Sequence, residues 1–122
     1  MANLFIRISA IYLVAGACLG MFMGITMNFT LIPVHAHILL AGWLSLAVMG
    51  LIYHAHPQSA RTRLAKWHCW LHNLGLPVFM ASLALAVNGH PIPVALATGS
   101  IALLAGLILF ALNVWLAVGR GP

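Results

Sequence analysis

Four long apolar stretches constrain the fold of this chain more than any other feature. A helix needs about 20 apolar residues to cross the hydrocarbon core of a bilayer. The 122 residues include no aspartate or glutamate, and only 4% of them are charged, whereas a soluble domain carries about 25%. The sequence therefore predicts an all-α integral membrane four-helix unit. It forms a single transmembrane domain, residues 1–122, with spans at about residues 8–27, 34–53, 67–87 and 94–118.

The five basic residues predict how this unit is oriented. Two of the three connections that join the spans carry no charge, and the basic residues all fall on the other side: Arg7, Arg61, Arg63, Lys66 and Arg120. The positive-inside rule makes that side the cytoplasm. We therefore expect a multi-pass protein of the inner (cytoplasmic) membrane with both termini in the cytoplasm. Five scattered basic residues form no stripe with interleaved aromatics, so nucleic acid is excluded as a partner.

Seven histidines are the main chemical feature of these spans. Ionisable groups inside a membrane are costly and indicate function, and neutral imidazole is a good ligand for iron, copper and zinc. His35 and His37 open the second span, and two residues correspond to about 200° of helical rotation. The two rings are therefore expected to point to opposite sides and to serve different sites. The alternative is that both hydrogen-bond to lipid headgroups or water at the outer interface.

A second pair, His68 and His72, opens the third span. The i, i+4 spacing puts both rings on one face of a helix, about 6 Å apart, so they could share a metal. The alternative is an interfacial pair beside Lys66. This pair lies by sequence at the inner end of its span, and the inner and outer ends of a span are about 26 Å apart. We therefore expect at most two sites, one near each membrane face.

The other features are less specific. His54 and His56 end the second span and are expected to be solvated, and His90, in an outside loop, is a weaker candidate ligand for the outer site. Gly16, Gly20 and Gly24 follow one face of the first span, a pattern that lets helices approach closely and favours assembly. No residue stands out as catalytic.

Two motifs together resemble a known family. His35-Ala36-His37, followed by an apolar span that ends near Tyr53, resembles the tenth helix of the main subunit of heme-copper oxidases. Residues 66–71, KWHCWL, resemble the K-x-H-F-W-L opening of the eleventh helix. The chain as a whole is similar to the last four helices of that subunit, and to small members of the superfamily that are only four helices long.

The resemblance implies a cofactor, an assembly and a function. In the family, the H-x-H residues ligate two hemes, one on each face of the helix, which implies b-type heme iron held by His35 and His37. The family's twelve helices form three arcs of four, which implies a homotrimer. Electron transfer, or small redox or diatomic-gas chemistry, would follow, with an electron donor or acceptor protein or a quinone as partner. A heme-dependent oxidoreductase activity stays open.

Departures from the family limit the prediction. The helices that carry the family's copper ligands have no separate counterpart here, and the acidic residues of proton conduction are absent. Proton-pumping oxygen reduction is therefore not supported. One alternative is a non-enzymatic protein, a sensor or assembly factor, whose histidines hold copper. Another is a passive channel or structural bundle with interfacial histidines.

Overall fold

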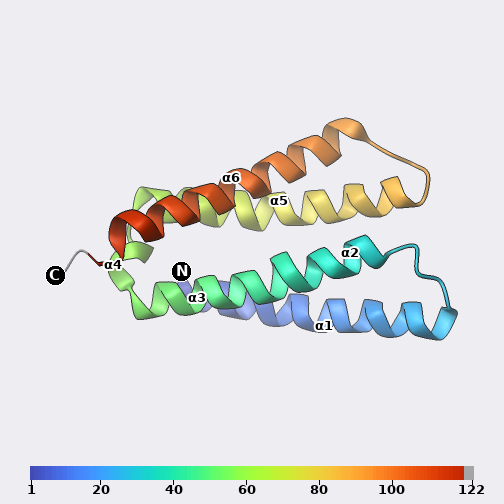
Figure 1. The fold of residues 1–122 in the computed structure, drawn as a ribbon, viewed down its shortest axis with the longest axis horizontal. Coiled ribbons are helices and arrows are strands. Elements are labelled where there is room, and N and C mark those ends of the chain that lie inside the picture. The colour runs from blue at the N-terminus through green and yellow to red at the C-terminus, as the bar shows by residue number, and fades with distance from the viewer. Residues whose placement is uncertain (120–122) are drawn as a thin grey trace.

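The computed structural model describes residues 1–119, which are helical apart from short connections. Four helices are long and apolar enough to cross a membrane, as the sequence predicts. The second of these is divided into three segments because its middle widens into a π-helix, η1. The elements are α1 (Ala2–Thr26), α2 (Ile32–His37), η1 (Ile38–Leu44), α3 (Ser45–Ala55), α4 (Pro57–Ala60), α5 (Arg63–Val87) and α6 (Pro93–Ala117) (Figure 1).

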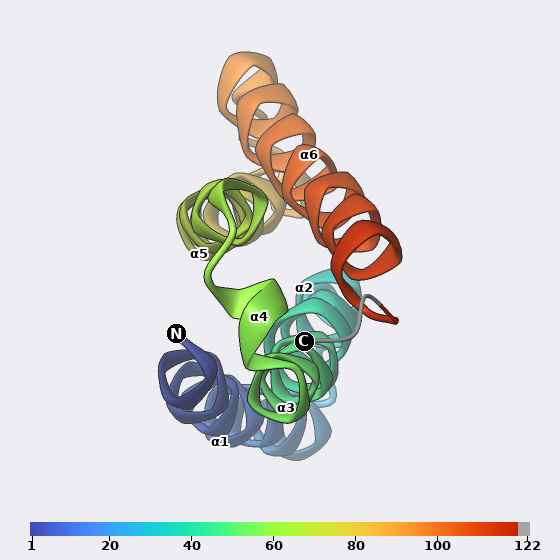
Figure 2. The same cartoon turned by 90° about the vertical axis from the view of Figure 1, so that its left-hand side faces the viewer.

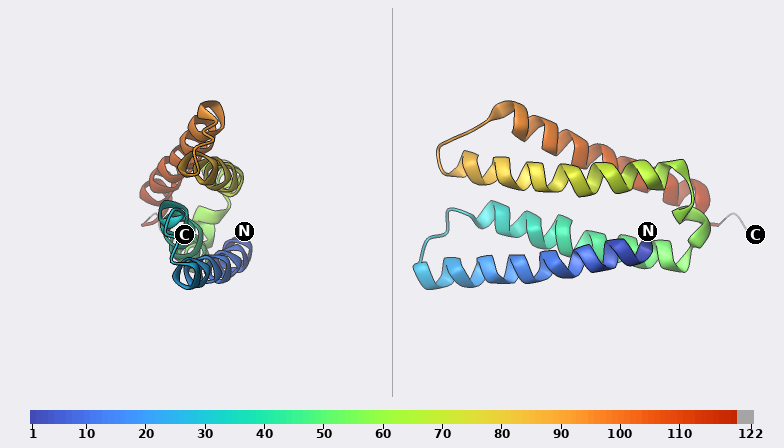
Figure 3. Two further views of the ribbon diagram at one scale, coloured as in Figure 1. Left: turned by 90° about the vertical axis from the view of Figure 1, so that its right-hand side faces the viewer. Right: turned by 180° about the vertical axis from the view of Figure 1, so that it is seen from behind.

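The helices form two antiparallel hairpins. One hairpin pairs α1 with the segments α2, η1 and α3, and the other pairs α5 with α6 (Figure 2). The short helix α4 joins the hairpins at one end, and the connections within the hairpins lie at the opposite end (Figure 3). We call the end at α4 the basic end, because Arg61 and Arg63 flank this helix. The start of α1 lies at the same end, where it packs against α3. We call the opposite end the loop end.

The core is small for a chain of this length. One cluster near the basic end surrounds Phe5, Leu46 and Tyr53, and another nearer the loop end surrounds Val34 and Leu76. In each spanning helix, between 17% and 33% of the most apolar window is buried inside the chain. Most of the apolar surface therefore faces outward, as expected where lipid replaces water as the solvent.

Two helices begin earlier than the predicted spans at residues 8 and 67. α1 starts at Ala2 and α5 at Arg63. α5 is capped by Thr62, whose side-chain oxygen accepts a hydrogen bond of 3.0 Å from the Ala65 N–H. Long basic side chains can reach the interface while the helix continues beneath them. The apolar stretch therefore marks the hydrocarbon depth, whereas the cap marks where the helix begins.

A polar cluster ties the two hairpins together at the basic end. Asn113 of α6 is 1% exposed, and its side-chain amide donates to the Ser59 carbonyl at 2.8 Å. The Thr62 hydroxyl donates to the Asn113 side-chain oxygen at 2.7 Å. Both ends of the buried amide are thus satisfied, which offsets the cost of placing it in an apolar helix. This cluster holds α4 against α6.

The π-helix η1 was not predicted from the sequence. The Ser45 N–H and hydroxyl both donate to the Leu40 carbonyl, the hydroxyl at 2.8 Å. On the side facing α1, Gly42 lies against the ring of Tyr12, where a Cβ atom would come within 2.5 Å of the ring. Such wide turns change the direction of carbonyl groups and occur frequently at functional sites. Here η1 directly follows His37 and faces the centre of the bundle with Ala41.

Candidate functional site

His35 is held between α2 and α1. Its Nδ1–H donates to the Gly16 carbonyl at 2.9 Å. The ring lies across Gly20, where an added Cβ would come within 2.8 Å of the His35 Cε1 atom. The absence of a side chain at Gly20 therefore makes room for the imidazole. The glycine stripe, interpreted from the sequence as a surface for assembly, receives η1 of the same chain at Gly16 and α2 at Gly20.

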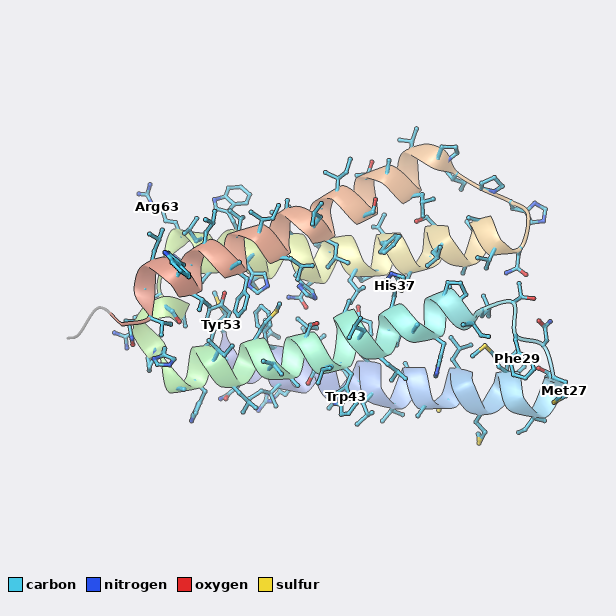
Figure 4. All side chains as sticks on the ribbon, in the orientation of Figure 1. Met27, Phe29, His37, Trp43, Tyr53 and Arg63 are labelled. Atoms are coloured by element: carbon cyan, nitrogen blue, oxygen red, sulfur yellow. The ribbon has the colours of Figure 1, made fainter. Side chains whose placement is uncertain are left out.

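His37 points the other way, toward α5 (Figure 4). Its Nδ1–H donates to the Pro33 carbonyl of its own helix at 2.7 Å. The ring packs edge-on against Phe79, with 5.2 Å between ring centroids and an angle of 81°. His35 thus faces α1 and His37 faces α5, which confirms the prediction that the two rings point to opposite sides.

The hydrogen bonds determine which ring nitrogen of each histidine is free. A carbonyl oxygen can only accept, so Nδ1 of His35 and of His37 must carry the proton. In the neutral ring, Nε2 then holds a lone pair. Metal-ligating histidines nearly always use their second nitrogen in this way, because the bond orients the ring and raises its basicity. Nε2 is therefore the nitrogen of each residue that could ligate a metal.

His68 and His72 lie in the protein core. Both side chains are 0% exposed, so the alternative of an interfacial pair beside Lys66 is wrong. His68 Nδ1 is 2.8 Å from the Tyr53 hydroxyl, and His72 Nε2–H donates to the Ala41 carbonyl at 2.9 Å. The two rings meet edge to face, with centroids 5.5 Å apart. The i, i+4 spacing does put them on one face, as predicted.

The depth of this pair also differs from expectation. α5 begins at Arg63, so His72 lies about 14 Å along the helix axis from its first residue. It contacts Ala41, which lies near the middle of the second span. The pair therefore extends to the centre of the bundle instead of staying at the inner face. Ala41 is only about one helical turn from His37.

The remaining histidines lie away from these groups. His54 is exposed at the end of α3, His56 precedes α4, and His90 is exposed in the connection between α5 and α6. Within residues 1–119, no three histidine, cysteine or acidic side chains gather in a way that could hold a metal. Any metal held by this chain alone would therefore have at most two such ligands.

Comparisons with known proteins add nothing to this picture. No protein family, characterised protein or solved structure matches the chain. The resemblance to heme-copper oxidases therefore stays a prediction that depends on the motif residues. The geometry of the histidines has to support any function by itself.

Several contacts that shape the site were not predicted from the sequence. The Gly16 carbonyl orients His35, Tyr53 contacts His68, and the π-helix presents the Ala41 carbonyl to His72. The glycine stripe was visible in the sequence, but nothing in it indicated a histidine as the group that fills it. No sequence signal predicted the π-helix.

Two glycines of the stripe allow a matched test of how the position of the His35 ring is fixed. A Gly20→Ala substitution should displace the imidazole and break its bond to Gly16, because the new methyl group would overlap the ring. Gly24→Ala introduces the same methyl group on the same helix face with no atom within 4 Å. We expect ligand binding that depends on His35 to fall in the first variant only, measured as cofactor retained per chain after purification. Equal retention in both variants would show that Gly20 does not position His35.

Proposed function

We propose that this chain is a heme-binding integral membrane protein in which His35 and His37 ligate b-type heme iron. One observation carries the proposal. Each ring donates Nδ1–H to a backbone carbonyl, which leaves Nε2 as a neutral donor suited to iron. The family resemblance of the H-x-H motif suggests heme over a bare ion.

The donor set fits a heme in its chemistry. In each of these two histidines, the hydrogen bond uses Nδ1 and leaves Nε2 free. Nε2 is also not among the buried nitrogens without a partner in the described residues, so a ligand can reach it. Bound heme would supply a one-electron iron centre, suited to electron transfer with two imidazole ligands and to gas binding with one. The chain contributes the orientation of the imidazoles.

The opposed rings favour an oligomer. His35 and His37 serve different faces of one helix, so they do not ligate the same iron within one chain. A second ligand to the same iron would come from a neighbouring copy, and closed ring symmetry is the common way to repeat such an interface. Three copies would reproduce the twelve helices of the oxidase main subunit, so we propose a homotrimer. An electron donor or acceptor protein or a quinone would be its redox partner.

An absorption spectrum tests the cofactor directly. The protein, purified in detergent from a heme-sufficient host, is expected to show a Soret band, and a pyridine hemochrome assay should identify b-type heme. Mass measurement of the same sample should give three chains per particle. Absence of a Soret band, both as purified and after addition of hemin, would overturn the heme proposal. A heme-loaded monomer would overturn the shared-ligand assembly alone.

The orientation in the membrane has its own test. We propose that the basic end faces the cytoplasm, because Arg61, Arg63 and Lys66 flank α4 there. A reporter that is active only in the cytoplasm should be active when fused after Pro122, and a periplasmic reporter should be silent. Periplasmic activity at that position would contradict the proposed orientation.

A further inference from the structure

Two imidazole nitrogens are enclosed in the core without a protein partner. They are His68 Nε2 and His72 Nδ1, on side chains that are both 0% exposed. A buried polar atom without a hydrogen bond costs roughly 1–3 kcal/mol, and natural cores rarely keep one without a reason. Two such atoms on neighbouring rings of one helix face indicate a shared ligand.

The other nitrogen of each ring is already engaged. His72 Nε2–H donates to the Ala41 carbonyl, which leaves a lone pair on Nδ1. His68 Nδ1 lies 2.8 Å from the Tyr53 hydroxyl, and when Nδ1–H donates to that oxygen, Nε2 also holds a lone pair. This is the supporting arrangement found behind metal-ligating histidines. The His68 ring also packs against Phe5 and Phe110, with centroid distances of 5.2 and 5.1 Å.

The geometry points to a Cu(I) site formed by His68 Nε2 and His72 Nδ1. The argument for this ion begins with charge. The chain has no acidic residue, and burying an ionic charge without compensation is costly. A monovalent ion is therefore favoured over any divalent ion. Both ligands are neutral, so the filled site would carry a single positive charge.

Coordination number supports the same ion. Zinc in structural sites takes four protein ligands, and in the part of the chain that the structure describes no third histidine, cysteine or acidic group joins the pair. Cu(I) is stable with two nitrogen ligands, and imidazole is among the ligands that copper accepts. The site shares no residue with the proposed heme ligands, so it does not depend on the heme proposal.

Anaerobic titration tests the site. The full-length protein in detergent is titrated with Cu(I) against a chromogenic Cu(I) chelator, and one Cu(I) per chain is expected to bind. His72→Gln keeps an N–H that can donate to Ala41 but replaces the imidazole donor with an amide oxygen, which Cu(I) binds poorly. Removal of a direct ligand should weaken binding by more than the roughly 10–100-fold that loss of a supporting contact costs. His68→Gln is a second variant that should show the same loss.

Three controls make the result specific. His90→Gln and His54→Gln alter exposed histidines and should leave Cu(I) binding unchanged, and heme content is measured in every sample. Retention of one Cu(I) with unchanged affinity in both His68→Gln and His72→Gln would overturn the site. Absence of Cu(I) uptake by the unsubstituted protein would also overturn it, and is the result expected if only a water molecule bridges the two nitrogens. Preferential binding of Zn²⁺ to this pair would overturn the choice of ion.

Discussion

Alanine at His35 or at His37 is expected to lower the heme content of the purified protein, and alanine at both positions to abolish it. Each ring offers an Nε2 lone pair on its own side of the helix, so each change removes a proposed ligand that the other histidine cannot replace. The loss of affinity should exceed the roughly 10–100-fold that follows removal of a contact supporting a metal ligand. Pyridine hemochrome assays per mole of chain measure it.

The controls for this experiment are the two histidines at the opposite end of the second span. His54→Ala and His56→Ala change histidines at the basic end, away from the proposed heme ligands, and should leave the heme spectrum intact. Full heme content in both His35→Ala and His37→Ala would contradict the interpretation of the H-x-H motif. The two rings would then have only the interfacial role that the sequence left open.

Gly99→Ala is expected to destabilise the hairpin of α5 and α6 more than any other glycine-to-alanine change discussed here. A Cβ at Gly99 would come within 2.5 Å of the Phe79 backbone nitrogen and 2.8 Å of its Cα atom. Backbone atoms cannot rotate away, so the two helices would have to separate. Such overpacking costs about 1–3 kcal/mol. Thermal unfolding in detergent, followed by circular dichroism, should show the loss.

Gly99→Ala should also affect His37. The Phe79 ring packs edge-on against His37, so a shift of its backbone would move the surface on which His37 lies. We therefore expect Gly99→Ala to lower heme content as well as stability. Gly24→Ala is the matched control, because its new methyl group has no atom within 4 Å. Equal stability of the two variants would show that the close approach of α5 and α6 contributes little.

The sequence alone predicted the membrane helices and the opposition of His35 and His37. The number of helices follows from the four apolar stretches, because only a helix satisfies its own backbone hydrogen bonds across the hydrocarbon, and an apolar stretch of about 20 residues is long enough to cross it. The directions of His35 and His37 follow from helical rotation within one element. Neither inference requires knowledge of what packs against what, and the structure agrees with both.

Only the tertiary structure decided which faces of the helices meet. The spans are apolar on all sides, so hydrophobic periodicity does not distinguish a lipid-facing surface from a buried one. For that reason the sequence is compatible with His68 and His72 at the membrane interface. In the structure α5 packs against α3 and η1, and both side chains are 0% exposed. The Ala41 carbonyl of the π-helix likewise meets His72, which belongs to a helix far away in the sequence. Local sequence carries no signal for such a contact, because Ala41 contributes only a backbone carbonyl and the two residues belong to different hairpins.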